Sequence, residues 1–209
     1  IAEESFLQIK DEIKPGATEN HVAAELEKAM KEAGAEGIAF PTIVASGERA
    51  ANPHAVSTDK KIRDGEVVVV DFGAKYKGYD SDLTRTVFVG DVGDTMRSAF
   101  DAVFDTQQTC FKALSLGAKL SDVANLAIKN LAKYKLDKYY THSLGHGIGL
   151  EVHESPYLST SSQDLLKEGQ TFTIEPGVYI EGVGGIRIED DFLSTKQGVT
   201  RLSSLPAKL

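Results

Sequence analysis

Only one cysteine occurs in the 209 residues, and no apolar run approaches the roughly 18 residues that a membrane-spanning helix needs. The lone Cys110 cannot form an internal disulfide, and because it lies in a helical pattern we expect it to pack in the core. Its isolation favours a reducing, cytoplasmic setting. Basic residues are also scarce: the formal net charge is −8, with no cluster of Lys or Arg. The chain is therefore expected to bind neither nucleic acid nor a membrane.

The rest of the composition is that of an ordinary globular protein, with 41% hydrophobic residues. A chain of this length can bury roughly 70% of the surface that its unfolded form exposes. No linker rich in Pro or Ser, shift in composition or low-complexity stretch divides it. We therefore expect a single domain, residues 1–209, built from two similar halves of about 1–92 and 93–209.

Each half shows the order helix, helix, strand, strand. Pro15-Gly16 ends the first helical pattern, and Thr18 can cap a second helix. In the second half, residues 94–114 form a long helical pattern, and Ser121 can cap the helix that follows. The repetition predicts an α+β fold with two pseudo-symmetric α-α-β-β halves around a mostly antiparallel sheet.

The stretch DGEVVVVDFGAKYKGYDSDLTRTVFV, residues 64–89, predicts a β-hairpin with a carboxylate on each strand. The valines at 67–70 are typical of a strand buried on both faces, which ends at Asp71. A second β-branched run begins just after Asp82, and the polar connection contains Gly78. If Asp71 and Asp82 lie opposite each other, their Cβ atoms are roughly 4.5–5.5 Å apart, and the charges repel unless they share a proton or a cation. From this stretch alone, two solvated aspartates are the alternative.

The second half repeats this arrangement. EGQTFTIEPG, residues 168–177, matches DGEVVVVDFG, residues 64–73, at a constant offset of 104 positions, which aligns Glu175 with Asp71. Glycines after Glu175 mark a turn, and an alternating strand then carries Glu189 at an equal distance beyond it. Two facing hairpins could bring four carboxylates into one cleft, which predicts a metal site.

Three of the five histidines fall in the glycine-rich stretch THSLGHGIGLEVHESP: His142, His146 and His153. Glycine at these positions lets the backbone approach another group closely. A lone histidine is more often structural than functional, but three histidines near a carboxylate cluster favour a site. Imidazole together with carboxylates indicates manganese, cobalt, iron or zinc in a two-metal centre rather than calcium.

Taken together, the motifs VVVVDFG, YKGYDSDLTRTVFVG, GHGIGLEVHESP, TFTIEPGVYI and GIRIEDD resemble those of the pita-bread metallopeptidases, which include methionine aminopeptidase, aminopeptidase P and prolidase. The resemblance covers nearly the whole chain. It implies a pita-bread fold and two divalent metal ions, manganese or cobalt first, with zinc or iron as alternatives. The five implied ligands are Asp71, Asp82, His146, Glu175 and Glu189, with Asp82 and Glu189 bridging the two ions.

The resemblance also implies a peptide hydrolysis and roles for further residues. Glu175 would carry a proton from the attacking water to the leaving nitrogen, and His153 would stabilise the tetrahedral intermediate. His54 and His142 would contact the substrate. Arg187 would support a metal-binding carboxylate or relay protons.

GIRIEDD, with Arg187 before Glu189, resembles the branch that acts on proline peptides: an Xaa-Pro aminopeptidase or Xaa-Pro dipeptidase, whose substrate has proline at the second position. Tyr79 and Tyr157 are candidates for an apolar wall against the proline ring. This branch usually carries an N-terminal domain and often forms homodimers, so the start at Ile1 predicts a missing upstream domain. Two alternatives stay open: a methionine aminopeptidase-like enzyme, and a non-catalytic peptide-binding module on the same scaffold.

Overall fold

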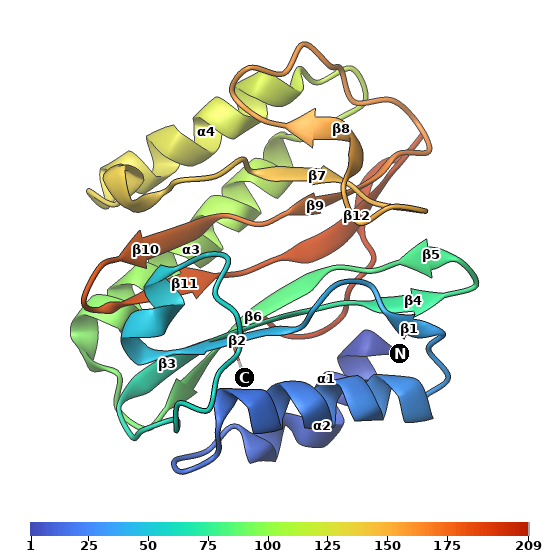
Figure 1. Ribbon diagram of the computed structural model, residues 1–209. Coiled ribbons are helices and arrows are strands. Elements are labelled where there is room, and N and C mark those ends of the chain that lie inside the picture. Colours follow the sequence, from blue (N-terminus) through green and yellow to red (C-terminus); the bar gives the residue numbers. More distant parts are fainter. Residues whose placement is uncertain (209) are drawn as a thin grey trace.

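The computed structural model describes residues 1–208, which form four α-helices and thirteen strands (Figure 1). The helices are α1 (Ala2–Ile9), α2 (Glu19–Glu32), α3 (Gly93–Ala113) and α4 (Leu120–Lys133). The strands of the first half are β1 (Gly37–Ile38), β2 (Ile43–Ser46), β3 (Glu66–Phe72), β4 (Ala74–Tyr76), β5 (Tyr79–Asp80) and β6 (Leu83–Val89). The strands of the second half are β7 (Gly145–Gly147), β8 (Glu154–Leu158), β9 (Thr171–Ile174), β10 (Gly177–Ile180), β11 (Gly184–Arg187), β12 (Asp190–Thr195) and β13 (Gly198–Arg201).

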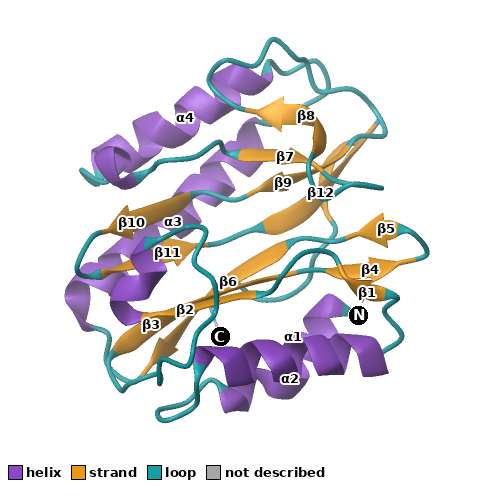
Figure 2. Cartoon of the chain, in the orientation of Figure 1, coloured by secondary structure: helices purple, strands orange, loops and turns teal. Residues whose placement is uncertain are grey.

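Two helices precede the strands in each half, as the sequence predicted. Helices α1 and α2 pack beneath the strands of the first half, and α3 and α4 pack behind those of the second half (Figure 1, Figure 2). The strands pair in the orders β2-β3-β6, β1-β4-β5, β10-β11 and β13-β12-β9-β7-β8. Each of these pairings is antiparallel, which confirms the expected α+β arrangement.

The four valines at 67–70 make β3 the centre of the first half. Val68 and Val70 belong to the core that also contains residues of α1 and α2. Val67 and Val69 face the opposite core, which contains residues of α3. Both faces of β3 are therefore covered, which explains why this strand has no polar face until it reaches Asp71.

The helix starts agree with one predicted cap and contradict the other. Thr18 caps α2, because its side chain accepts a hydrogen bond from the backbone N–H of His21 at 3.1 Å. Ser121 is not a cap; it lies inside the first turn of α4 and is buried. The helix begins two residues earlier than a cap at Ser121 would place it, because Lys119 is held in an extended bridge with Leu165 and Leu120 is the first residue free to turn.

The predicted register of the first hairpin was wrong by two positions. Asp71 pairs with Thr84, and Asp82 lies just before the first residue of β6 rather than opposite Asp71. The cause is the turn, which Lys77 and Gly78 form with φ values of 51° and 78°. Two successive residues with positive φ close a two-residue hairpin and place its centre between 77 and 78. Asp71 and Asp82 still lie on one face, because Asp82 and Thr84 differ by two positions.

The predicted register of the second hairpin is confirmed. Gly177 pairs with Arg187 in β10–β11, and Ile174 pairs with Asp190 in β9–β12. By the same register, Glu175 and Glu189 lie opposite each other, between the β9–β12 pairing and the β10–β11 pairing. An isolated bridge between Thr84 and Glu189 joins this point to β6 of the first half.

A buried ion pair fixes the backbone behind this junction. The side chains of Arg85 and Asp190 are fully buried and approach to 2.6 Å. The Arg85 guanidinium also donates to the backbone oxygens of Glu189 at 2.5 Å and Leu205 at 2.7 Å. One arginine thus ties β6 to Glu189, to the first residue of β12 and to the C-terminal segment.

Replacing Asp190 with Asn should strongly destabilise the protein, because the Arg85 charge would then be buried without a countercharge. The expected loss is about 3–5 kcal/mol in the free energy of unfolding, measured by urea denaturation. Asp91→Asn is the matched control, since the Asp91–Arg97 pair is solvent-exposed. Equal stability of the Asp190 and Asp91 variants would contradict a structural role for this pair.

Candidate metal centre and substrate cleft

A cavity of about 480 Å³ lies where the carboxylate-bearing ends of the hairpins meet. Its wall includes the nine residues expected to bind metal, to contact the substrate or to take part in catalysis: His54, Asp71, Asp82, His142, His146, His153, Glu175, Arg187 and Glu189. Residues separated by more than 100 positions in the chain are therefore neighbours, as the repeat predicted. Of the described residues lining the cavity, Arg187 is the one arginine or lysine.

Asp82, His146 and Glu189 form the tightest group. Each is buried and offers one ligand atom, and these atoms lie within 4.8 Å of one another. His146 Nε2 is 3.7 Å from Asp82 Oδ2 and 3.4 Å from Glu175 Oε1. Asp71 stands on the other side of the group, where Arg187 Nη2 donates to its Oδ2 at 2.6 Å.

The hydrogen bond of His146 indicates what belongs between these groups. Its Nδ1 lies 3.0 Å from the backbone oxygen of Gly147, so Nδ1 carries the proton and Nε2 presents a lone pair to the carboxylates. Buried oxygens Asp71 Oδ1 and Asp82 Oδ1 have no hydrogen-bond partner among the described residues. A lone pair that faces carboxylate oxygens, with buried acceptors left unpaired, is the donor set that a divalent cation requires. These residues fit a metal centre.

The pKa values of three carboxyl groups are raised, which shows that their ionised forms are disfavoured when no cation is bound. Burial and the charge of Glu189 raise the pKa of Asp82 well above its usual range, and burial and the charge of Glu175 do the same for Glu189. Burial raises the pKa of Glu175 to about 8, although the positive charge of Arg187 opposes the rise. Burial lowers the pKa of His146 to about 4, so its imidazole is neutral at pH 7.

Three residues outside the predicted set of site residues support the site. Thr84 donates to Glu189 Oε2 at 2.6 Å and accepts from Arg187 Nε at 3.0 Å. Asp191 accepts the backbone N–H of Asp82 at 3.1 Å. The third is Tyr179. Each of the three lies an even number of positions from a predicted ligand: Thr84 from Asp82, Asp191 from Glu189, and Tyr179 from Glu175. Strand alternation is thus the one signal in the sequence that could have found them.

Tyr179 links two of the predicted residues. Its hydroxyl accepts from Arg187 Nη1 at 2.9 Å and lies 2.8 Å from His142 Nε2. His142 Nδ1 contacts the backbone oxygen of Ser143 at 2.7 Å, so Nε2 is the acceptor and Tyr179 donates to it. Gly177 leaves room for this pair, because a Cβ there would stand 2.5 Å from the Tyr179 hydroxyl.

The remaining predicted residues line the mouth of the cavity. The His153 ring lies 4.1 Å from that of His146, centroid to centroid. Tyr157 lines the cavity, but Tyr79 does not; it is 62% exposed at the β4–β5 hairpin. The glycines around His146 approach neighbouring strands closely: a Cβ on Gly145 would overlap the Thr173 backbone oxygen. These glycines therefore allow the strands to pack closely.

Comparison with known proteins agrees with this geometry. Residues 1–196 match the model of metallopeptidase family M24. The chain belongs to metallopeptidase family M24. The Xaa-Pro dipeptidases of Pyrococcus horikoshii and Pyrococcus furiosus are each 43% identical to this M24 chain over all 209 residues. The chain spans 60% of the length of these relatives.

Solved structures show the same fold. An X-Pro aminopeptidase from Thermotoga maritima superposes with a TM-score of 0.96 at 41% identity, covering 100% of this M24 chain and 60% of that one. Prolidase from Pyrococcus furiosus gives a TM-score of 0.96 at 42% identity, covering 98% and 61%. The predicted pita-bread fold is confirmed. Among the residues that the structure describes, no helix is both long enough and apolar enough to span a bilayer.

Without metal, the stability of this M24 chain should fall as the pH rises from about 6.5 to 8. Glu175 has a folded pKa of about 8 against an ordinary value of 4.5, so folding favours its protonated form, and that contribution is lost as the pH passes through 8. His142 and His146, with pKa values lowered to about 4 from 6.5, act in the opposite direction only below pH 6.5. Calorimetry in chelator should show a declining Tm across this window.

Two further samples make this measurement decisive. Adding Mn²⁺ or Co²⁺ should raise Tm and flatten the decline, because a bound cation favours the ionised carboxylates. Glu175→Gln should make the decline shallower without metal, while Asp82 and Glu189, whose pKa values are also raised, keep part of it. A metal-free Tm that stays constant or rises between pH 6.5 and 8 would contradict the raised pKa of the cluster.

Proposed function

We propose that this chain is the catalytic part of an Xaa-Pro peptidase, which hydrolyses the bond between an N-terminal residue and a following proline. The observation that carries the proposal is the neutral His146, whose Nε2 lone pair faces buried carboxylates at 3.4 and 3.7 Å. The relatives named Xaa-Pro dipeptidase support the substrate class. We further propose that residues 1–209 form one catalytic domain with halves of about 1–92 and 93–209.

We assign the metal ligands to Asp71, Asp82, His146, Glu175 and Glu189, with two divalent ions, manganese or cobalt before zinc or iron. When bound, such ions polarise the scissile carbonyl and lower the pKa of the attacking water. Arg187 holds Asp71 in place through the 2.6 Å bond to its Oδ2, and Thr84 holds Glu189. Both contacts leave the other oxygen of each carboxylate free to bind a cation.

Glu175 is the residue that we assign to proton transfer. Its carboxyl group lines the cavity, and burial, which outweighs the opposing charge of Arg187, raises its pKa to about 8, near the pH at which a general acid–base works best. Glu175 Oε2 also lies 3.9 Å from His142 Nδ1. Proton delivery is important for this substrate, because the leaving nitrogen of a prolyl bond belongs to a tertiary amide.

The histidines at the mouth of the cavity act on the substrate itself. We assign His153 to donate a hydrogen bond to the oxygen that becomes negative during attack. His54 and His142 would contact the peptide, and Tyr157, with Phe40 and Val152, provides an apolar wall for the proline ring. Homodimer formation and a cytoplasmic setting stay predictions from the sequence.

The alternative functions have less support. A methionine aminopeptidase-like enzyme would share the metal ligands, but the relatives reported above are named for Xaa-Pro or X-Pro substrates. A non-catalytic peptide-binding module has no need for a buried carboxyl group with a pKa of about 8 next to an apolar cleft. Assays that compare Xaa-Pro peptides with Met-Ala peptides distinguish the proposal from both alternatives.

With metal present, Ala-Pro or Ala-Pro-X peptides should be cleaved far faster than Met-Ala or Ala-Ala peptides. The physical reason is that the apolar wall favours the pyrrolidine ring, and no backbone N–H is required at that position. Initial rates with chromogenic or mass-detected peptides measure this. Asp82→Asn is the inactive control. Equal or faster cleavage of Met-Ala would transfer the chain to the methionine aminopeptidase branch, and no cleavage at all would favour the binding module.

His153→Ala should lower kcat and kcat/KM by about 10²-fold, because it removes a contact made to the transition state. The metal content, measured by atomic emission after dialysis, should stay at the wild-type level, since His153 is not one of the five ligands. His21→Ala, which alters an exposed histidine of α2, is the matched control. Loss of metal in the His153 variant would place this residue among the ligands and contradict the assignment.

A further inference from the structure

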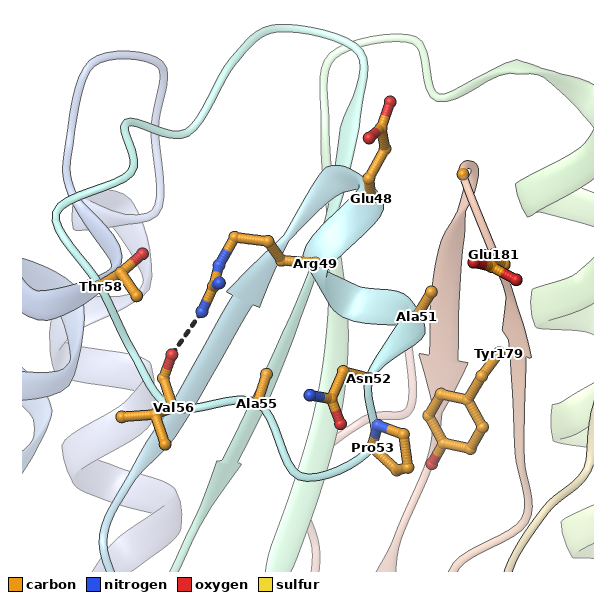
Figure 3. Close-up of a pocket in the computed structure, with 11 residues that line it drawn as sticks. Glu48, Arg49, Ala51, Asn52, Pro53, Ala55, Val56, Thr58, Tyr179 and Glu181 are labelled. Atoms are coloured by element: carbon orange, nitrogen blue, oxygen red, sulfur yellow. Dashed lines mark hydrogen bonds between the residues drawn. The ribbon is translucent and has the colours of Figure 1, made fainter.

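The segment that carries His54 has space on both sides. It joins the short helical turn Gly47–Ala51, which follows β2, to β3, and its residues Pro53 and Val56 line the substrate cleft. The same two residues also line a second cavity of about 820 Å³ on the outer side (Figure 3). Val56 is 79% exposed. Of residues 52–58, Ala55 is buried in the core that also contains Val67 and Val69 of β3, while the others are exposed or half-buried, so polar contacts must position the rest of the loop.

A buried carboxylate closes the base of the loop. Glu19, at the start of α2, is fully buried. It accepts hydrogen bonds from Ser46 N at 2.8 Å and Ser46 Oγ at 2.9 Å, just before the loop. It also accepts from Thr58 N at 3.1 Å and Thr58 Oγ1 at 2.7 Å, just after the loop. One side chain thus holds the two ends of the loop together.

Arg49 extends this contact to the tip of the loop. Its Nε donates to Glu19 Oε2 at 3.0 Å, while its Nη2 donates to the backbone oxygen of Val56 (Figure 3). The guanidinium is planar and presents donors on several edges, so it can bind a carboxylate and a carbonyl at once. A lysine ammonium is a single point charge and cannot bridge the two positions in this way.

The tip is also held from the inner side. Arg187 Nη1 donates to the backbone oxygen of Pro53 at 3.2 Å, and the same guanidinium binds Asp71. The Asn52 side chain accepts the backbone N–H of His54 at 3.0 Å, which shapes the turn between these contacts. The residues on either side of His54 are thus held by two arginines: Arg187 contacts Pro53, and Arg49 contacts Val56.

We propose that Glu19 and Arg49 are positioning residues that hold the His54 loop against the substrate cleft and so set the affinity for the peptide. This proposal rests on the proposed function, because it takes His54 as a substrate contact. Neither residue touches the reacting atoms. Releasing the loop lowers the fraction of molecules ready to bind, which raises the apparent dissociation constant by the same factor and leaves the chemical step unchanged.

The test compares Arg49→Met with Glu48→Gln in the full, metal-loaded chain. Methionine keeps the apolar stem of the arginine but removes its donors. Glu48 belongs to the same helical turn, is exposed, and points away from the loop in Figure 3, so its variant is the matched control. With an Ala-Pro substrate, Arg49→Met should raise KM by about tenfold or more while kcat changes by less than about twofold. Arg49→Lys should behave like Arg49→Met, and Glu48→Gln like the wild type.

Hydrogen exchange at residues 52–58 is the second measurement, and it does not depend on activity. Exchange there should be faster in Arg49→Met and Glu19→Gln than in the wild type and Glu48→Gln. Wild-type exchange in Arg49→Met would overturn the proposal, and so would faster exchange with an unchanged KM. If the wild type itself does not cleave Xaa-Pro peptides, the proposed function fails, while exchange still decides whether Glu19 and Arg49 hold the loop.

Discussion

Four carboxylates around one cavity, opposed by a single guanidinium, form the constraint on which the rest of this structure depends. Burial disfavours the charged forms of Asp82, Glu175 and Glu189, and neighbouring charges disfavour their ionisation further, which is why the pKa values of Asp82 and Glu189 lie well above their usual range. The apolar core must supply the stability that brings these groups together. A bound cation offsets both the burial of the carboxylates and the repulsion between them, so these groups favour metal binding.

The repeated hairpin is how the chain meets this constraint. In each half an apolar strand leaves the core at the position where the carboxylate stands, so the acidic group is at the end of a buried element rather than within it. Glu175 and Glu189 occupy the interval between the β9–β12 and β10–β11 pairings. The Thr84–Glu189 bridge then joins the two halves at the cavity. Rigid strands on both sides hold the ligand atoms at short, defined distances.

Two arginines with different partners hold the two sides of this junction. Arg85 faces away from the cavity and ties Glu189, Asp190 and the C-terminal segment together through buried contacts. Arg187 faces the cavity and contacts Asp71, Tyr179 and the backbone of the His54 loop. The first arginine stabilises the scaffold, and the second connects the scaffold to the groups that would bind the substrate.

The amino-acid sequence by itself determined the α-α-β-β repeat, the buried valine strand and the four carboxylates at the cavity, because these depend on local periodicity and on an offset of 104 positions. His54 and Arg187 were expected at the site only through the resemblance to the pita-bread metallopeptidases. The sequence also predicted the level pairing of Glu175 and Glu189, since the glycines between them mark the turn. Local pattern was insufficient where a neighbouring segment decided the outcome. Ser121 does not cap α4, because the bridge between Lys119 and Leu165 makes the helix begin at Leu120.

Only the tertiary structure decided which groups share protons and hydrogen bonds at the site. The register of the first hairpin depended on the positive φ values of Lys77 and Gly78, and Lys77 is a residue type that rarely adopts them. Strand alternation can suggest which face Tyr179 lies on, but neither its contact with His142 nor the contacts of Glu19 with Ser46 and Thr58 can be read from local sequence. Hydrogen-bond networks are set by three-dimensional distance and direction, which periodicity along the chain does not encode.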